Sequence, residues 1–366
     1  MTLEEKLQEL RTEYSKTKYN KATNKHLGIL RKKIAKIRRE LSEKKGSTGV
    51  GFAVRKTGDA TVALVGFPNA GKSSFLGDIT NAESRIADYA FTTLTVIPGM
   101  LEYNGAKIQI LDIPGLIEGA SIGKGGGRKI VSVIRIADII AFVVDVNNPS
   151  QLYKLIDELF TLDIRVNSEP PRIRLERRKA GGIDIEANGH KVPAKQDIVS
   201  LLGEAKMYNA YVVFYQNATL DDLSDALDNN ITYVSAITLL NKIDTVDRDY
   251  ASTMAKELEK TTGMPVVQIS AAKRINLESA KEAIFSRLDV MRIYLKPKGG
   301  AADMERPLII RKNSTVMDVA KKLHSKTANL LKHAYVSGRS VKFSNQLVGG
   351  EHRLMDGDMV TLAFDK

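Results

Sequence analysis

The chain has 366 residues, of which 43% are hydrophobic, so it can form more than one domain with a buried core. It has no cysteine, which excludes disulfides and thiolate metal sites, and no apolar run of about 18 residues, which argues against a transmembrane span. The formal net charge of +12 favours a polyanionic partner, and the charged residues 1–6 do not resemble a signal peptide, so we expect a cytoplasmic protein that does not bind membranes.

The amino-terminal part of the chain is predicted to form a basic helical hairpin. Leucines and isoleucines between 27 and 41 alternate spacings of three and four, which is typical of a packed helix, and residues 18–21 favour a turn before it. From Lys16 to Lys45, 12 Lys or Arg stand against two Glu, a net charge of +10. This imbalance favours contact with a phosphate backbone, RNA above all, over an ordinary solvated helix face.

The most informative motif is the stretch 66–73, which reads Gly-Phe-Pro-Asn-Ala-Gly-Lys-Ser between an apolar strand at 60–65 and the start of a helix. Glycines let backbone N–H groups close around a β-phosphate, and the helix N-terminus adds partial positive charge. We expect Lys72 to reach the β- and γ-phosphates as a catalytic residue and Ser73 to ligate Mg²⁺. The residues predicted to bind nucleotide here are Asn69, Ala70, Gly71, Lys72, Ser73 and Ser74.

Two later segments have the composition of elements that sense a γ-phosphate. In the connection 88–95, one threonine would ligate Mg²⁺, and we favour Thr93 over its neighbour Thr92. A strand at 107–111 then ends in Asp112-Ile-Pro-Gly115. Asp112 would hold Mg²⁺ through water, and the Gly115 N–H would bond the γ-phosphate and release it on hydrolysis. Thr93 and Gly115 are therefore predicted to act in catalysis.

The base-reading element is predicted where the strand at 237–240, which follows an earlier strand at 139–144, delivers Asn241-Lys242-Ile243-Asp244. The carboxylate of Asp244 can accept hydrogen bonds from N1–H and the 2-amino group of guanine, two donors that adenine lacks. A further strand at 266–269 leads to a predicted backbone clamp for the exocyclic oxygen of the base, formed by Ser270, Ala271 and Ala272. Together the five motifs favour GTP and GDP over ATP.

Three residues bear on the rate of hydrolysis. Leu116 stands where many GTPases place the glutamine that orients the attacking water, so intrinsic hydrolysis should be slow or use a water held by backbone, a partner or a cation. The amide oxygen of Asn69 is a candidate ligand for K⁺ beside the phosphates, although Asn is also simply a favourable turn residue, and both interpretations stay open. No arginine finger is identifiable from the sequence, and Arg128, beside the glycine-rich stretch 123–127, is only a conceivable candidate.

The run from 51 to 116 resembles the Obg superfamily of GTPases and, within it, the developmentally regulated GTP-binding (DRG) proteins of the archaeal kind. The resemblance rests on Thr-Gly-Asp-Ala, Val-Gly-Phe-Pro, Phe-Thr-Thr-Leu-Thr, Ile-Pro-Gly and Asp-Ile-Pro-Gly-Leu-Ile-Glu-Gly-Ala, and extends over nearly the full length. It implies a ribosome-associated GTPase, often potassium-stimulated, in which a hydrophobic residue such as Leu116 replaces the catalytic Gln. Eukaryotic relatives often have Ser-Val in place of Asn69-Ala70, whereas this sequence has the Asn-Ala pattern of other potassium-activated GTPases, which favours a potassium site here. Eukaryotic relatives also use a dedicated partner protein, so a protein regulator is a further expectation.

We predict five segments: a basic helical domain at 1–57, the nucleotide-binding core at 58–165 and 233–291, an inserted α+β domain at 166–232 and a C-terminal domain at 292–366. In the insertion, strands at 172–175 and 182–185 are predicted to form a basic hairpin, with helices at 194–208 and 220–227. This hairpin is a second candidate RNA contact, unless its charge serves only solubility.

The C-terminal segment has the pattern of a small β-grasp domain, which the resemblance identifies as TGS. We predict a strand at 308–311, a helix at 315–325 with Thr315 and Asp318 as its capping box, and a final strand at 359–364.

The predicted fold is therefore a doubly wound α/β GTPase core with an N-terminal helical hairpin, an inserted α+β domain and a C-terminal β-grasp domain. The predicted function is magnesium-dependent GTP hydrolysis by a monomer whose nucleotide state controls binding to the ribosome, its RNA or tRNA. One alternative is an RNA-binding adaptor that keeps GTP as a structural ligand, which Leu116 favours. Another is an ATPase of a related Obg-like subfamily, against which Asp244 argues.

Overall fold

The structure is a computed structural model of the chain. It describes residues 5–6, 9–10, 12–13, 30, 37, 56–80, 97–113, 126–228, 230–297, 299–323 and 328–364. The predicted N-terminal helical hairpin, with its basic stretch 16–45, lies almost entirely outside these residues. No helix within the described ranges is long and apolar enough to cross a membrane.

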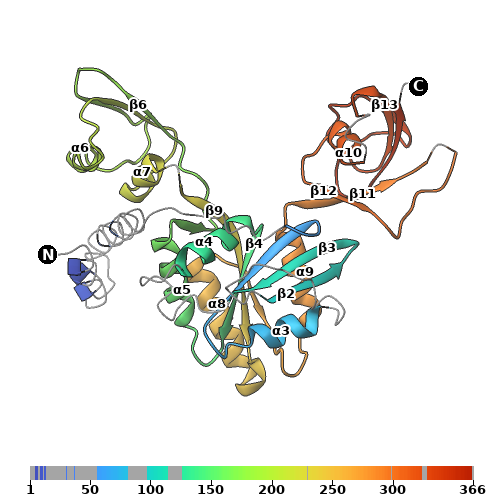
Figure 1. The fold of residues 1–366 in the computed structure, drawn as a ribbon, viewed down its shortest axis with the longest axis horizontal. Coiled ribbons are helices and arrows are strands. Elements are labelled where there is room, and N and C mark those ends of the chain that lie inside the picture. Colours follow the sequence, from blue (N-terminus) through green and yellow to red (C-terminus); the bar gives the residue numbers. More distant parts are fainter. Residues whose placement is uncertain are drawn as a thin grey trace. The chain divides into compact units, whose positions relative to one another are not determined.

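The central sheet carries the predicted motifs and is parallel except at one edge (Figure 1). Its strands run in the order β10-β9-β4-β1-β3-β2, in which β2 pairs antiparallel with β3, whereas β1 pairs parallel with β3 and β4, and β9 pairs parallel with β10. Their bounds are β1 Ala60–Val65, β2 Ile97–Tyr103, β3 Ala106–Asp112, β4 Ile139–Asp145, β9 Thr232–Asn241 and β10 Val266–Gln268. A short strand, β5 Ile164–Val166, pairs with the beginning of β9. The five predicted core strands are confirmed.

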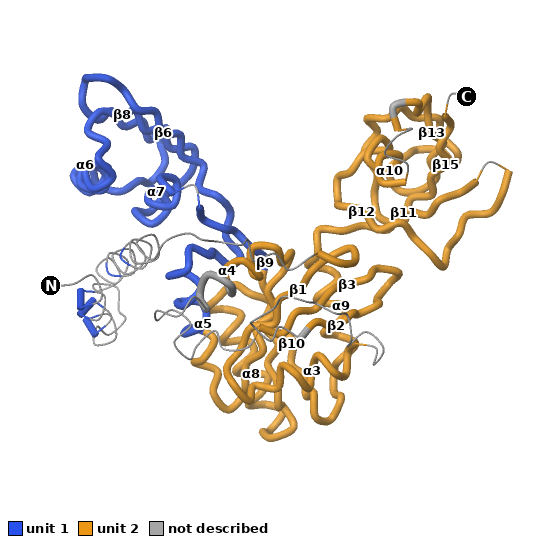
Figure 2. The backbone as a smooth tube through the Cα atoms, viewed as in Figure 1, with its two compact units in different colours: residues 1–52, 121–127, 153–235 blue, residues 53–120, 128–152, 236–366 orange. Residues whose placement is uncertain are grey.

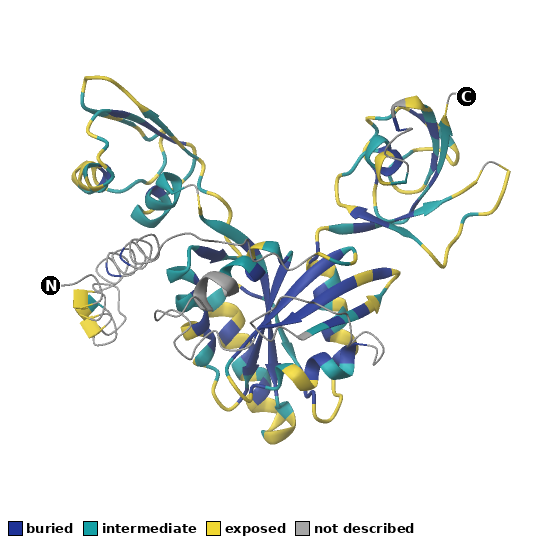
Figure 3. Cartoon of the chain, in the orientation of Figure 1, coloured by how far each residue is buried: buried dark blue, intermediate teal, exposed yellow. Residues whose placement is uncertain are grey.

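The inner strands of this sheet are buried on both faces, as their dark colour in Figure 3 shows. All six residues of β1 are buried, although neighbouring side chains of a strand point to opposite faces. Val62 and Leu64 share one cluster with Phe75 of helix α3 and Ile284 of helix α9. Two-sided burial is what distinguishes a parallel sheet covered by helices, so the doubly wound fold is confirmed. The helices of this part of the chain are α3 Lys72–Ile79, α4 Gly126–Ile136, α5 Gln151–Thr161, α8 Arg248–Thr262 and α9 Leu277–Arg287.

The inserted sheet has a strand order that differs from the prediction. Its strands β6 Ile173–Arg177, β7 Ile183–Glu186 and β8 Ala210–Phe214 lie in the order β6-β8-β7. The predicted basic hairpin is therefore wrong, because β8 lies between the two strands that were expected to pair. The sequence of β8, Ala-Tyr-Val-Val-Phe, is mostly buried and apolar, which suits the central position of a sheet.

Two helices complete the inserted module. Helix α6 Lys195–Glu204 and helix α7 Leu220–Leu227 contribute buried leucines to one cluster with Val212 and Phe214 of β8. The helix predicted at 220–227 is confirmed. The helix predicted at 194–208 ends earlier, because Lys206 takes a left-handed conformation with φ 56° and reverses the chain toward β8.

The C-terminal sheet runs in the order β12-β11-β15-β13-β14, with β11 parallel to β15, and helix α10 packs on one face. Thr315 N donates to Asp318 Oδ2 at 2.9 Å and Asp318 N donates to Thr315 Oγ1 at 3.3 Å, so the predicted capping box is confirmed. This is the predicted β-grasp arrangement. Its elements are β11 Val290–Leu295, β12 Leu308–Arg311, α10 Val316–Leu323, the 3₁₀ turn η3 Ala328–Leu330, β13 Leu331–Ser337, β14 Gln346–Val348 and β15 Asp358–Phe364.

By its internal contacts the chain divides into two compact units, coloured in Figure 2. The first contains 1–52, 121–127 and 153–235, and the second contains 53–120, 128–152 and 236–366. Strand β9 begins in the first unit and continues in the second. All the predicted nucleotide-binding residues that the structure describes belong to the second unit, so the site can be described within it.

A largely buried ion pair joins the inserted module to the strand that precedes it. Arg165 of β5 donates to both carboxylate oxygens of Asp225 in α7, from Nε at 2.7 Å and from Nη2 at 2.8 Å. Each side chain is 10% exposed, and the guanidinium also lies 3.7 Å from the centre of the Phe160 ring. A buried charge depends on its partner, because its desolvation is otherwise uncompensated.

We predict that Asp225→Ala destabilises the inserted module by about 3 kcal/mol, because Arg165 keeps its charge and loses its carboxylate. Hydrogen exchange of the amides between 183 and 214 measures this local free energy of opening. The control is Glu169→Ala, which breaks an ion pair with Arg172 whose side chains are 87% and 71% exposed and which should change exchange by less than about 0.5 kcal/mol. Equal protection in the wild type and Asp225→Ala would contradict the prediction.

Candidate nucleotide-binding site

The phosphate-binding loop lies between β1 and α3, as the sequence predicts, and its glycines are required by contact. A Cβ on Gly66 would lie 2.4 Å from the carbonyl oxygen of Val143, and a Cβ on Gly71 would lie 2.2 Å from Nδ2 of Asn241. Gly71 also has φ 94°, a conformation that side chains rarely adopt. The loop therefore packs directly against the ends of strands β4 and β9.

The ammonium group of Lys72 lies within the loop itself. Its Nζ donates to the carbonyl oxygens of Gly66 at 3.0 Å and Phe67 at 3.1 Å. Burial lowers the pKa of Lys72, and the nearby charge of Asp112 acts in the opposite direction. A partly desolvated cation at the first turn of a helix is a strong attractor for phosphate oxygens.

The predicted magnesium ligands Ser73 and Asp112 are in direct contact, since Ser73 Oγ donates to Asp112 Oδ2 at 2.8 Å. The other carboxylate oxygen, Asp112 Oδ1, is buried and has no hydrogen-bond partner among the described residues. A buried unpaired carboxylate oxygen is costly, and a metal-bound water would supply the missing donor. No cluster of three acidic or histidine side chains exists in the described part of the chain. The donor set fits Mg²⁺, which typically takes one or two protein ligands and completes its shell with water and phosphate.

Asn241 connects the phosphate loop to both base-reading loops. Its buried amide donates from Nδ2 to the carbonyl oxygen of Ala70 at 2.8 Å and accepts at Oδ1 from the backbone N of Ala271 at 3.0 Å. One side chain thus fixes the relative positions of the ends of β1, β9 and β10. The sequence predicts that Asn241 binds nucleotide, and the structure gives it the role of joining the loops.

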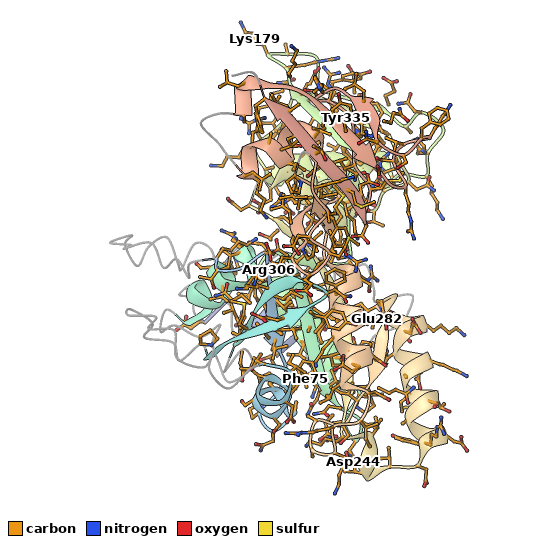
Figure 4. The ribbon with its side chains drawn as sticks, turned by 90° about the vertical axis from the view of Figure 1, so that its right-hand side faces the viewer. Phe75, Lys179, Asp244, Glu282, Arg306 and Tyr335 are labelled. Carbon is orange, nitrogen blue, oxygen red and sulfur yellow. The ribbon has the colours of Figure 1, made fainter. Side chains whose placement is uncertain are left out.

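Asp244 lies in a 3₁₀ turn, η2 Ile243–Thr245, directly after β9. Its side chain is exposed and its Oδ1 accepts a hydrogen bond from Ser270 Oγ, which orients the carboxylate. Figure 4 shows Asp244 at the lower end of the view, below Phe75 of α3. An oriented, accessible carboxylate is the group needed to read the guanine edge.

Most of the predicted site residues are brought together at one edge of the central sheet. These are Asn69, Ala70, Gly71, Lys72, Ser73, Ser74, Asp112, Asn241, Lys242, Asp244, Ser270, Ala271 and Ala272. Thr92, Thr93, Gly115 and Leu116 lie outside the described residues. Arg128 lies in helix α4 rather than in a glycine-rich loop.

One contact of the site is absent from the sequence-based prediction. Lys242 forms an ion pair with Asp145, the last residue of β4, with Nζ 2.7 Å from Oδ2. The signal that would have found Asp145 is its position, because ligands of open parallel sheets bind at the carboxyl ends of strands.

Comparison with known proteins gives the family. Residues 61–175 match the model of the 50S ribosome-binding GTPase family, 180–290 match the C-terminal region of that domain, and 291–363 match the TGS domain. The chain is 40% identical to developmentally-regulated GTP-binding protein 1 of Xenopus laevis, over 98% of each chain. It is 41% identical to an uncharacterised GTP-binding protein of Methanocaldococcus jannaschii, over 100% of this chain and 94% of the relative.

This chain belongs to the DRG family of GTPases. Among solved structures, the YchF GTPase of Schizosaccharomyces pombe matches 84% of this DRG chain and 99% of its own, with a TM-score of 0.52 and 15% identity, which supports the fold alone. The DRG assignment means that the site binds guanine nucleotide, and the geometry of Ser73 and Asp112 agrees with magnesium as its companion.

We predict that Gly71→Ala lowers the affinity of this DRG protein for GDP at least about tenfold, because the new Cβ would collide with Asn241 and displace the loop. Titration with a fluorescent GDP analogue measures the affinity. Gly263→Ala is the matched control, since Gly263 also has a positive φ, 67°, but nothing lies within 4 Å of its Cβ position. Its affinity for GDP should equal that of the wild type. An unchanged affinity in Gly71→Ala would refute the steric argument.

Proposed function

We propose that this DRG-family protein is a slow, potassium-stimulated GTP hydrolase whose nucleotide state controls its binding to the ribosome or its RNA. The observation that carries the proposal is the hydrogen bond between Ser73 of the phosphate loop and Asp112. Asp112 is the first residue of Asp-Ile-Pro-Gly, so the segment that senses the γ-phosphate begins at a residue bonded to the phosphate loop. A change at the phosphates therefore acts directly on that segment.

The residues of the site have separate tasks in hydrolysis. Mg²⁺, when bound, would offset the negative charge that develops on the transferred group. Ser73 and Asp112 would hold it, and Lys72 would neutralise the β- and γ-phosphates from within the loop. Thr93 and Gly115 are proposed to contact the γ-phosphate or its magnesium. Because Leu116 carries no group that can orient water, the rate without an activator is slow.

Potassium is proposed to supply a positive charge in place of an arginine finger. Asn69 is exposed, has φ 63° and lies within the phosphate loop, three residues before Lys72. The left-handed backbone explains why Asn suits this turn, and it leaves the amide free to face solvent at the loop. The two roles of Asn69 are compatible, and they can be separated by experiment.

The proposed partner is ribosomal RNA or tRNA on the ribosome, bound by a monomer in the cytoplasm with or without a protein regulator. The net charge of +10 between Lys16 and Lys45 supports an RNA contact, as does the description of the matching family model as a ribosome-binding GTPase. The arginines of the inserted module contribute less, because Arg174 pairs with Glu176 and Arg178 pairs with Asp184. The proposal therefore assigns RNA binding to the N-terminal element.

The alternative is an RNA-binding adaptor that carries GTP without using its hydrolysis. Leu116 favours it, since the usual water-orienting side chain is missing. The two functions differ in one measurable respect: an adaptor binds ribosomes equally well with GTP and with GDP.

We predict that the full chain co-sediments with ribosomes about tenfold more tightly with a non-hydrolysable GTP analogue than with GDP. In Asp244→Asn, the non-hydrolysable xanthosine analogue should tighten ribosome binding and the guanosine analogue should no longer do so. The reason is that the new amide donates to the carbonyl that xanthine has at position 2. This swap shows that the nucleotide, and not the folded state, controls ribosome binding. Equal binding with every nucleotide would reject the switch and establish the adaptor.

We predict that wild-type turnover at saturating GTP is about tenfold faster in KCl than in NaCl. Asn69→Gly keeps the left-handed turn but removes the amide oxygen, so its turnover should be equal in the two salts with GTP affinity nearly unchanged. The control is Asn104→Gly, another left-handed asparagine, with φ 51°, in the turn between β2 and β3. If Asn69→Gly still hydrolysed GTP faster in KCl than in NaCl, Asn69 would serve only the turn and would not bind potassium.

A further inference from the structure

An ion pair attaches the loop that carries Asp244 to the end of the neighbouring strand β4. Lys242 Nζ lies 2.7 Å from Asp145 Oδ2, and the side chains are 34% and 15% exposed. Asp145 ends β4 at the edge of the sheet where β9 delivers Lys242. The pair is shielded from solvent enough to fix the position of Lys242 relative to β4, whereas fully exposed ion pairs contribute little to stability.

Asn147 and Thr245 close this ion pair into a ring. Asn147 Nδ2 donates to Asp145 Oδ1 at 2.9 Å and to Thr245 Oγ1 at 3.0 Å, and Thr245 Oγ1 donates to the carbonyl oxygen of Lys242 at 2.8 Å. An amide nitrogen has two hydrogens and a hydroxyl can donate and accept at once, so every bond of the ring has a donor. A closed network of this kind stabilises one arrangement of its members.

The backbone inside the ring has an unfavourable conformation. Lys242 has φ 65° and ψ 32°, a left-handed conformation that costs a non-glycine residue about 1 kcal/mol. The backbone N of Val146 also donates to the carbonyl oxygen of Asn241 at 3.0 Å. Lys242 thus changes the chain direction between Asn241, which is bonded to the phosphate loop, and Asp244, which faces the base.

Asp145 keeps its charge under ordinary conditions. Burial opposes ionisation of its carboxyl, but the hydrogen bonds from Lys242 and Asn147 outweigh burial and hold the pKa of Asp145 below its usual range. The ion pair is therefore present at neutral pH.

We propose that Asp145 and Asn147 are positioning residues for guanine recognition, which hold Lys242 to Thr245 so that the Asp244 carboxylate meets the guanine edge. This inference rests on the proposed role of Asp244 in reading the base. It assigns specificity to residues that need not touch the nucleotide. A purely structural role for the same ring would lower stability and leave the preference among purines unchanged.

The test compares GTP with inosine triphosphate, which lacks the 2-amino group and offers Asp244 only N1–H. In the wild type the ratio of the two dissociation constants should favour GTP by about tenfold or more, since a charged acceptor then loses one donor. In Asp145→Asn, the misdirected carboxylate should weaken GTP binding about tenfold and inosine triphosphate binding much less, so the ratio falls toward one. Isothermal titration of the full chain measures both constants.

The control is Asp138→Asn, at the opposite end of the same strand. Asp138 accepts from Lys56 Nζ at 2.8 Å and from the backbone N of Thr61 at 2.8 Å, so its replacement removes a similar ion pair far from the base loops. Its thermal stability should fall and its nucleotide ratio should equal that of the wild type. If Asp145→Asn does not fold, Asn147→Ala replaces it, because it keeps the ion pair and removes only the side-chain hydrogen bonds from Asn147 to Asp145 and Thr245.

The inference would be overturned if a folded Asp145→Asn or Asn147→Ala kept the wild-type ratio of dissociation constants. This holds whether the affinities equal those of the wild type or are lowered alike for both nucleotides. It would leave the proposed function intact, because the wild type still binds GTP. Failure of the wild type to bind GTP, or to prefer it over inosine triphosphate, would instead remove the premise that Asp244 reads guanine.

Discussion

The site depends on the buried amide of Asn241 more than on any other single group. Its two hydrogen bonds join the loop after β1 to the loop after β10, and Ala70 and Ala271 supply the backbone partners. A side-chain amide can donate and accept at the same time from one short planar group. A carboxylate would face the carbonyl oxygen of Ala70 with no proton to offer, and an apolar side chain would leave two buried backbone groups unpaired. The spatial relation between phosphate loop and base loops therefore follows from one residue type at one position.

The sheet explains why this single bond can organise three loops. β1, β9 and β10 are parallel strands of one sheet, with β4 between β1 and β9, so their carboxyl ends meet at one edge. β1 and the last six residues of β9 are buried on both faces, which leaves the loops that follow them little freedom to shift. Asp145 reaches Lys242 for the same reason, since β4 lies next to β9. Recognition and phosphate chemistry thus result from the topology, and the motifs supply the groups that the topology brings together.

The sequence predicts well what depends on neighbouring residues. The β-branched run before the phosphate loop, the helix after it, and the capping box of Thr315 and Asp318 all involve contacts between residues close in the chain. It predicts pairing between distant segments poorly. The hairpin expected in the insertion was wrong because β8, about 30 residues later, lies between its strands, and no local pattern specifies such pairing. In the same way, the motifs identified Lys242 and Asp244 but not Asp145, whose contact with Lys242 spans 97 residues.

Unfavourable backbone conformations give an independent indication of where function lies. Among the described residues, the non-glycine positions with positive φ are mostly Asn or Asp, which adopt it at low cost, and the exceptions are Lys206, Lys242 and Arg274. Lys206 ends a helix, whereas the other two belong to the base-reading loops. Each of these two has its cationic side chain bound by an aspartate, Lys242 by Asp145 at 2.7 Å and Arg274 by Asp78 at 2.9 Å. An asparagine or glycine would satisfy the turn alone, and the shielded ion pair of Lys242 with Asp145 adds a contact that fixes the direction of the loop as well as its conformation. Base recognition requires that direction, because the N1–H and 2-amino groups of guanine donate to a carboxylate along one edge of the base.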